Sequence, residues 1–216
     1  MSVQEKVREE TTKWVGPRPL TFAQFLELYG AKDQVELVDG VVVERRMVQL
    51  DHERLNGWLY VVLSLYTEVL GLGIVLGSRT AVEIDQFRGR LPDLLFVRKA
   101  RMEIVQQKAI YGAPDLILEI SSPNDRLSES IALETDYRAI GAPEIVFIDP
   151  GKRRVRVLRK QTDGYSEEVL ATGALVLESM DGLSLELEWL FGEPRPDQRA
   201  TVDALLARAG SLNTER

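Results

Sequence analysis

The sequence contains no cysteine, no long apolar run and no excess of positive charge. The absence of cysteine excludes disulfides, thiolate metal sites and cysteine nucleophiles together. The longest apolar stretch, Leu59 to Leu65, is interrupted by Tyr60 and Ser64 and is too short to cross a membrane. The amino-terminal segment is charged and no apolar stretch follows it, so it is not a signal peptide. These absences predict a cytoplasmic protein.

The net charge is −7 over 216 residues. Proteins that hold nucleic acid electrostatically usually have a basic surface, so this balance argues against tight, non-specific DNA binding. It does not argue against a nuclease, because an active site built of carboxylates adds negative charge that a bound metal offsets. Short basic runs occur at Arg45-Arg46, 98–101 and 152–154. Most such runs are solvated faces, but these are the obvious places for phosphates.

Hydrophobic spacing and turn residues predict an α/β domain with a mixed central sheet and flanking helices. The strand–helix–strand run from 115 to 149 indicates a parallel crossover, and Asp39-Gly40 is typical of a tight antiparallel hairpin. Asp51 is expected to cap a long helix. We expect a tail over 1–19, one domain over 20–192, and a linker with a C-terminal helix over 193–216. Helices are expected at 21–29, 51–70, 126–140 and 199–209, and strands at 35–38, 41–45, 73–77, 80–85, 91–97, 115–121, 144–149, 153–160, 165–170 and 174–178.

Two segments repeat the same pattern, P-D-L-L-F-V over 92–97 and P-D-L-I-L-E-I over 114–120. In the second, Glu119 interrupts an apolar strand, and a lone buried carboxylate is costly unless it is neutral or paired. Asp93 and Glu119 on adjacent strands would give a divalent metal two hard oxygen ligands. The alternatives are local. Glu119 could bond to an arginine or to backbone amides, and Asp93 or Asp115 could satisfy backbone amides at the start of its strand.

Side-chain alternation places Glu119 on one face of its strand and Leu116, Leu118 and Ile120 on the other. The sequence Ser121-Ser122-Pro123 then breaks the strand, so Glu119 is expected near its carboxyl end. Ligand sites in such sheets tend to lie beyond the carboxyl ends of the strands.

The order of several motifs resembles a known family. The motifs are E-L-V-D-G (36–40), Asp51-His52 at a helix start, R-L-P-D-L-L-F-V (90–97), P-D-L-I-L-E-I-S-S-P (114–123), Y-R-A-I-G-A-P-E (137–144) and V-F-I-D-P (146–150). Over about residues 20 to 191 the chain is similar to the bacterial family of putative restriction endonucleases, abundant in cyanobacteria, within the PD-(D/E)xK nuclease superfamily. The resemblance implies a restriction-endonuclease-like fold and hydrolysis of DNA phosphodiester bonds with Mg²⁺ or Mn²⁺.

The resemblance also implies roles for individual residues. Asp93 would be the first metal ligand and Glu119 the second, with the backbone carbonyl of Ile120 as a third. Glu36 matches an early acidic position that completes the carboxylate cluster, and His52 matches the family's histidine. On spacing alone, His52 lies one turn before an apolar helix position and is more typical of a core or capping histidine.

The chain departs from the family pattern at the lysine. The superfamily position two residues after Glu119 is Ser121, and the position on the next helix to which the lysine often moves is Leu133. Arg126 is the nearest cation in sequence. A guanidinium stays protonated and makes a poor general base, although it can stabilise transition-state charge.

Three function hypotheses remain. The first is an active metal-dependent DNA endonuclease, the second a nuclease-derived binding or regulatory module with little turnover, and the third a structural protein whose carboxylates are local caps. A homodimer would suit cutting of both strands. The C-terminal helix, with its apolar face of Val202, Leu205 and Leu206, could form the dimer or dock on the chain's own core.

Overall fold

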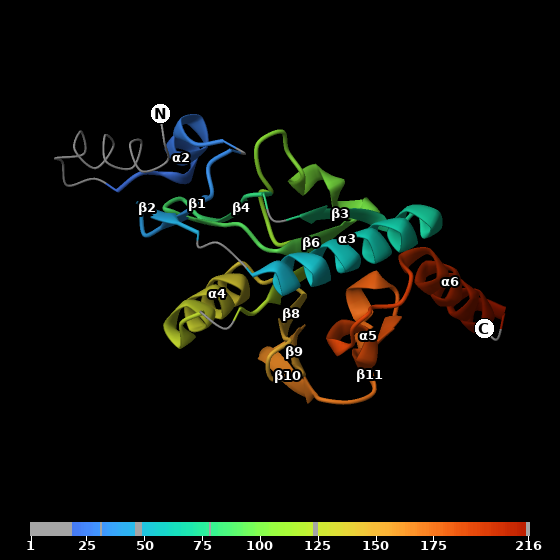
Figure 1. Ribbon diagram of the computed structural model, residues 1–216. Coiled ribbons are helices and arrows are strands. Elements are labelled where there is room, and N and C mark those ends of the chain that lie inside the picture. Colours follow the sequence, from blue (N-terminus) through green and yellow to red (C-terminus); the bar gives the residue numbers. More distant parts are fainter. Residues whose placement is uncertain (1–18, 31, 46–48, 78, 123–124, 215–216) are drawn as a thin grey trace.

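The computed structural model describes residues 19–214 except 31, 46–48, 78 and 123–124. The expected amino-terminal tail therefore lies outside the described residues, apart from residue 19. Arg46 and Pro123 also lie outside them. A six-stranded sheet in the order β10-β9-β8-β7-β6-β3 forms the centre (Figure 1). Only the β7–β8 pair is parallel among these strands, so the sheet is mixed, as predicted. The strands are β10 (Gly164–Leu170), β9 (Arg154–Gln161), β8 (Glu144–Asp149), β7 (Leu116–Ile120), β6 (Leu94–Arg98) and β3 (Gly73–Gly77).

A second, four-stranded sheet has the order β2-β1-β5-β4. Its β1–β2 turn is the predicted one, with Asp39 at φ 52° and Gly40 at φ 76°, because a tight hairpin turn needs left-handed backbone at both central residues. A side chain on Gly40 would also overlap Cβ of Pro19. The strands are β1 (Val35–Val38), β2 (Val41–Glu44), β4 (Val82–Asp85) and β5 (Arg88–Arg90).

The prediction of a single strand over 91–97 is wrong at its start. Arg88–Arg90 forms β5 in the small sheet, and β6 begins in the large sheet only at Leu94. The three residues between them include Pro92, which cannot donate a backbone hydrogen bond to a sheet. Asp93 is the last of these three, so it stands where the two sheets join.

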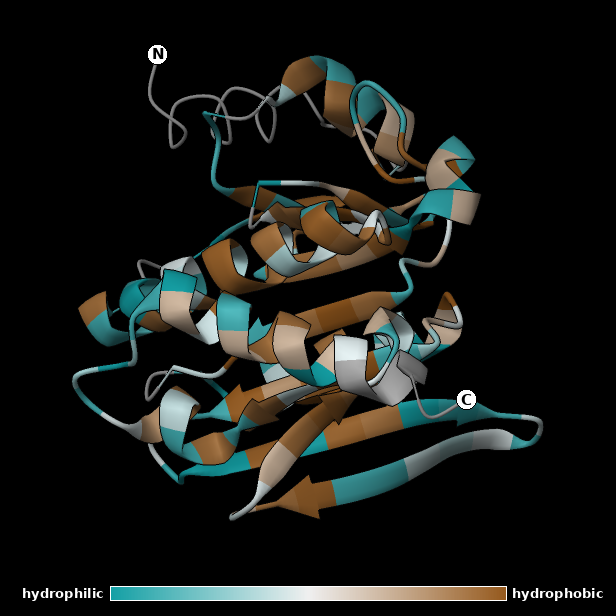
Figure 2. Ribbon diagram, turned by 90° about the vertical axis from the view of Figure 1, so that its right-hand side faces the viewer, coloured by the Kyte–Doolittle hydropathy of each residue, from teal (hydrophilic) through white to brown (hydrophobic). Residues whose placement is uncertain are grey.

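One face of the large sheet is covered by α3 (Leu50–Leu70), which buries Leu55, Leu59 and Val62 against it. The cap prediction for this helix is wrong by two residues, because the N-cap is Gln49 and Asp51 lies in the first turn. Negative charge is favourable there as well. Apolar residues are concentrated on the strands of the sheets, whereas the helices carry apolar and polar residues in turn (Figure 2).

The opposite face of the sheet is covered by α4 (Leu127–Ala139), which is the predicted crossover helix between β7 and β8. The predicted alternation along β7 is confirmed. Leu116, Leu118 and Ile120 pack in the α3 layer, whereas Ile117 packs with Tyr137 of α4. Glu119 shares the face of Ile117 and is therefore turned toward α4.

The strand expected over 174–178 is confirmed as β11 (Ala174–Leu177). Two elements after it were not predicted: β12 (Leu183–Glu186), which pairs with β11 in a two-stranded sheet, and α5 (Leu187–Phe191). The last helix, α6 (Gln198–Thr214), continues five residues beyond its expected end. The remaining elements are α2 (Phe22–Leu28), packed on the small sheet, and the short 3₁₀ helices η1 (Lys99–Ile104) and η2 (Glu178–Met180).

The apolar face of α6 is used within the chain. Val202 and Leu205 are buried in the same cluster as the residues of α3, and Trp58 Nε1 donates to the carbonyl of Pro196 at 2.9 Å. Of the two roles considered for this helix, docking on the chain's own core is the one observed (Figure 1). Across the described residues, no helix has both the length and the apolar character needed to cross a bilayer.

Candidate active site

Asp93 is held by three groups from different elements. The backbone N–H of Ile120 donates to Oδ2 at 2.9 Å, and His52 Nε2 lies 3.0 Å from the same oxygen. Arg45 Nη2 donates to Oδ1 at 3.3 Å. Asp93 is 3% exposed. Both of its oxygens are therefore held by partners that are distant in the sequence, so the local explanation, an amide at the start of its own strand, does not describe Asp93.

The charges of Asp93 and His52 stabilise each other. Burial opposes ionisation of Asp93, but the hydrogen bond and charge of His52, the charge of Arg45 and the amide of Ile120 together lower its pKa. Burial likewise opposes protonation of His52, yet the hydrogen bond and charge of Asp93 raise its pKa. His52 is buried, as the core interpretation predicts, but its partner is a carboxylate and not an apolar neighbour.

Glu119 has a different environment from Asp93. Its Oε1 accepts a hydrogen bond of 2.5 Å from the hydroxyl of Tyr137, which is fully buried on α4. Burial, together with the charge of Asp93, raises the pKa of Glu119 well above its ordinary value. Neither local alternative considered for Glu119, an arginine or a backbone amide, describes this contact. The two carboxyl groups are thus pushed toward opposite protonation states.

Glu36 lies on β1 in the neighbouring small sheet. Its Oε2 accepts from Arg90 Nη1 at 2.9 Å, and its Oε1 accepts from the backbone N–H of Leu91 at 3.1 Å. These contacts engage both oxygens in holding β5 and the connection to Asp93. Glu36 therefore lies close enough to Glu119 for its charge to act on that group, but its own partners are an arginine and a backbone amide.

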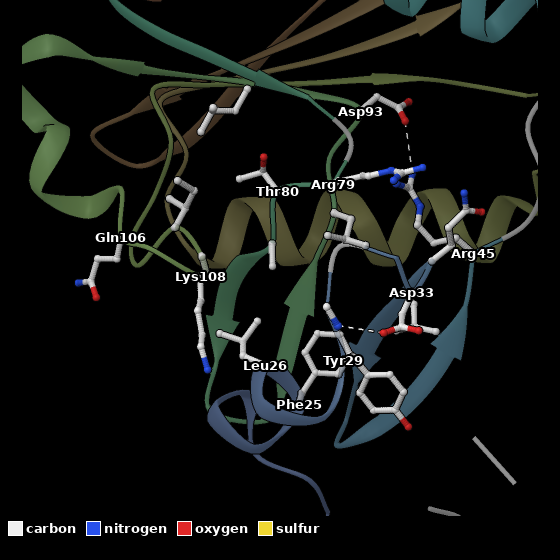
Figure 3. Close-up of a pocket in the computed structure, with 18 of the residues that line it drawn as sticks. Phe25, Leu26, Tyr29, Asp33, Arg45, Arg79, Thr80, Asp93, Gln106 and Lys108 are labelled. Atoms are coloured by element: carbon white, nitrogen blue, oxygen red, sulfur yellow. Dashed lines mark hydrogen bonds and ion pairs between the residues drawn. The ribbon is translucent and has the colours of Figure 1, made fainter. Parts of the chain in front are cut away.

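Two cavities open on this cluster. The first, of about 530 Å³, lies beside α4 and is lined by Glu119, Ile120, Arg126 and Leu133; we call it the α4 cavity. The second, of about 750 Å³, extends toward α2 and is shown in Figure 3; we call it the α2 cavity. Three residues line both cavities, namely Arg45, His52 and Asp93.

Comparison with known proteins identifies the family. A sequence model of the family Uma2, described as "Putative restriction endonuclease", matches residues 22–191. The chain belongs to the Uma2 family. A crystal structure titled as a putative nuclease belonging to DUF820 from Anabaena variabilis ATCC 29413 is similar, with a TM-score of 0.67 and 20% identity. The similarity covers 80% of this chain and 98% of that one and supports the nuclease-like fold. No curated protein matches the chain.

This Uma2 chain has a cation at its carboxylate cluster although both lysine positions lack one. Burial opposes the charge of Arg45, but Glu119, Glu36 and Asp93 together raise its pKa, so it stays protonated. Its Nε lies 3.7 Å from Oε1 of Glu36. The register of the hairpin, which follows from the turn at Asp39-Gly40, indicates this contact from the sequence. Glu36 pairs with Val43 in the hairpin, which places Arg45 diagonally across from Glu36 on the same face.

A second ion network ties the small sheet to α4. Asp136 is 1% exposed and accepts from Arg90 Nε at 2.7 Å and from Arg88 Nη1 at 2.6 Å. Arg88 also pairs with Asp39 in the hairpin turn. Because Arg90 binds Glu36 as well, the network fixes the position of the acidic cluster relative to the helix that carries Tyr137.

We expect Asp136→Ala to lower the free energy of unfolding by about 3–5 kcal/mol, because Arg90 would be left buried without this carboxylate. Urea denaturation measures the change. The matched control is Asp51→Ala, whose side chain is 81% exposed in the first turn of α3, and which should lower stability by less than about 1 kcal/mol. A loss below about 1 kcal/mol for Asp136→Ala, as for an exposed ion pair, would contradict the role assigned to the network.

The carboxylate oxygens of Asp93 and Glu119 are the type of ligand atom that a hard divalent metal prefers. Among the residues that the structure describes, no group of three or more His, Asp or Glu side chains converges as a ready ligand set. Asp93 and Glu119 are neighbours, however, since Leu94 pairs with Leu118 across β6 and β7. Mg²⁺ is usually held by one or two carboxylates, with water and phosphate oxygens filling its other positions. A dication would also favour the ionised form of Glu119, which burial disfavours.

Proposed function

We propose that this chain is a divalent-metal-dependent endonuclease that hydrolyses DNA phosphodiester bonds. The observation that carries the proposal is the pair of buried carboxyl groups, Asp93 and Glu119, next to Arg45 at the floor of a cavity. Perturbed carboxyl groups in a cleft are typical of catalytic sites. Membership of the Uma2 family supports phosphodiester hydrolysis as the chemistry.

Each residue has a role in the proposal. Asp93 and Glu119 would hold Mg²⁺ or Mn²⁺, with the carbonyl of Ile120 as a third ligand. The bound ion would supply Lewis-acid polarisation of the phosphate and a water of lowered pKa. His52 fixes the orientation of Asp93. Arg45 would stabilise negative charge on the phosphate.

Tyr137 and Glu36 would position these groups without binding the metal themselves. The Tyr137 hydroxyl orients Glu119, and its own pKa is raised well above the ordinary value by burial and by the charge of Glu119, so it remains a donor. Glu36 holds Arg90 and the strand connection that ends at Asp93. DNA is the proposed substrate and a homodimer the proposed assembly, since cutting both strands needs two sites.

The test combines cleavage with metal binding. Wild-type protein should cut plasmid or single-stranded DNA with Mn²⁺ in a series of salt concentrations and pH values. Calorimetry should show Mn²⁺ binding that disappears in Asp93→Asn. Burial raises the pKa of Glu119, and a bound metal requires its ionised form, so metal binding should release protons at pH values below the raised pKa. The heat should then vary with the ionisation enthalpy of the buffer. No cleavage on either substrate would overturn the endonuclease proposal, and no metal binding would favour a structural role.

A second candidate is a nuclease-derived binding or regulatory module with little turnover, favoured by Ser121 and Leu133 at the two lysine positions. Under this hypothesis, Leu133→Lys places a cation in the wall of the α4 cavity and raises Mn²⁺-dependent cleavage by about 10²-fold or more. The control is Leu127→Lys on the same helix, where the leucine is 76% exposed. Cleavage by the wild type that is lost in Glu119→Ala would exclude the second candidate.

A further inference from the structure

The six-stranded sheet ends in an exposed edge strand, β10. Among the described residues β10 pairs with β9 alone, and seven consecutive residue pairs join the two strands without a bulge. The long hairpin of β9 and β10 forms the bottom edge of the sheet in Figure 2. Glu167 and Val169 are exposed, and Val169 is 52% exposed. An edge of this kind carries backbone groups that no neighbouring strand satisfies.

Alternate residues of β10 turn their backbone groups to the free edge. The turn at 162–163 closes on the pair of Gln161 and Gly164. A two-residue hairpin turn closes on a hydrogen-bonded pair, and hydrogen-bonded and non-hydrogen-bonded pairs then alternate along an antiparallel ladder. The residues whose backbone N–H and C=O groups point away from β9 are therefore Tyr165, Glu167 and Val169.

The usual protections of an edge strand are missing from β10. Natural sheet edges are protected by short strands, proline, lysine or bulges. β10 has seven residues, with no proline and no lysine. The small sheet, in contrast, ends in two strands of four residues, and one of them, β4, has an irregular register.

The two charged side chains of β10 point back toward β9 and do not shield the edge. Glu167 Oε1 accepts from Arg156 Nε at 2.8 Å, and Glu168 Oε2 accepts from Arg159 Nη1 at 2.8 Å. Two copies of a chain with a net charge of −7 repel each other, so contact between them is favoured where the surface is locally neutral. Because each glutamate of β10 has its own arginine, this edge meets that condition.

We propose that β10 pairs with β10 of a second copy of this chain, antiparallel and around a two-fold axis at Ser166, so that the two large sheets become one. Addition of a strand to an exposed sheet edge is an established mode of recognition, in which backbone hydrogen bonds supply the affinity. The pairing locates the interface of the proposed homodimer. It rests on the proposed function only for its consequence, the use of two sites to cut both strands.

The charges on β10 select the register. A two-fold axis at Ser166, Glu167 or Glu168 pairs at least five of the seven residues of the strand with their copies. An axis at either glutamate puts like charges directly opposite each other, which destabilises a pair. An axis at Ser166 places Tyr165 opposite Glu167 of the second copy, and Gly164 opposite Glu168 of that copy. Cβ built on Gly164 meets no atom within 4 Å, which leaves room for the glutamate.

The absence of cysteine makes this register directly testable. In Ser166→Cys the new thiol lies opposite its copy in a non-hydrogen-bonded pair, with Cα atoms about 4.5 Å apart, which suits a disulfide. Mild oxidation should therefore give a covalent dimer on a non-reducing gel. The matched control is Glu168→Cys, exposed on the same face of the same strand. Its copy lies more than about 13 Å away along the paired strands, so it should stay monomeric.

Proline at the edge measures the contribution of the backbone. Glu167→Pro removes an N–H that points to the free edge, where a sheet tolerates proline, and so removes two hydrogen bonds from each dimer. Glu167→Ala removes the same side chain and keeps the N–H. In sedimentation equilibrium, proline should weaken dimerisation by about tenfold or more, and alanine by less than about threefold. Thermal unfolding checks that both variants are folded.

The outcomes separate the interface from the proposed activity. Equal cross-linking of Ser166→Cys and Glu168→Cys, or a wild-type dimer that Ser166→Cys fails to trap, would overturn the proposal. Dimers that do not cleave DNA would leave the interface intact and refute the nuclease. Cleavage by a wild type that sediments as a monomer, without selective cross-linking of Ser166→Cys, would refute the interface alone.

Discussion

Replacing Glu119 with glutamine is expected to lower metal-dependent cleavage strongly and, at the same time, to stabilise the metal-free protein. The pKa of Glu119 is raised by burial and by the charge of Asp93, so the folded protein keeps a proton that the unfolded chain releases. Unfolding then becomes easier as the pH rises above the ordinary pKa of 4.5, by up to about 1.4 kcal/mol per pH unit until the raised pKa is reached. Glutamine is neutral and can still accept the Tyr137 hydrogen bond.

Urea denaturation between pH 5 and pH 8 tests this expectation. The unfolding free energy of the wild type should fall with pH relative to Glu119→Gln, while cleavage with Mn²⁺ falls by about 10³-fold in the variant. Asp93 contributes in another window, because its lowered pKa gives stability that is present above its ordinary value of 3.8 and lost as the pH falls through the folded pKa. Glu68→Gln, at an exposed position on α3, is the control. A variant less stable than the wild type at pH 8 would contradict the assigned protonation state.

Replacing Arg45 is expected to separate metal binding from catalysis. In Arg45→Leu the positive charge beside Asp93 and Glu36 is lost, so Mn²⁺ should bind up to about tenfold more tightly. Cleavage should nevertheless fall by about 10²-fold, because the charge on the phosphate loses its stabilising partner. Arg45→Lys keeps the charge without the planar fork and should retain part of the activity.

Calorimetry with Mn²⁺ and cleavage assays at saturating Mn²⁺ measure the two effects separately. Arg54→Leu, at a side chain 59% exposed on the first turns of α3, is a control for loss of an arginine near the site. If Arg45 served only to hold the fold, metal affinity and cleavage would fall together with stability. That outcome would refute the catalytic role.

The parts of the fold that could be predicted are those fixed by local spacing. The β1–β2 hairpin depends on Asp39-Gly40, and the division of the β7 side chains between the two layers follows from alternation along the strand. Asp115 accepts from a backbone N–H, as expected, but the donor is not local: it is Arg98, at the end of the neighbouring strand β6, at 2.9 Å. Arg101 Nη1 donates to the other oxygen of Asp115 at 2.9 Å.

The parts that could not be predicted depend on packing between distant segments. The separation of β5 from β6 reflects the existence of two sheets, which no single strand pattern reveals. The partner of Glu119 is Tyr137, eighteen positions away on another element, and the partner of His52 is forty-one positions away. The position of Arg45 was accessible from the hairpin register, but its proximity to Asp93 required the joining of the sheets.

The docking of the two sheets also determines the stage of folding at which the candidate site forms. Glu36 contacts Leu91 across 55 positions, and Arg45 contacts Asp93 across 48. Such contacts close long loops and form slowly compared with helices and turns. A chain emerging from the ribosome therefore has no complete site until Tyr137 has been synthesised and the sheets have docked. Hydrolytic competence would thus be a property of the finished fold, absent from its nascent intermediates.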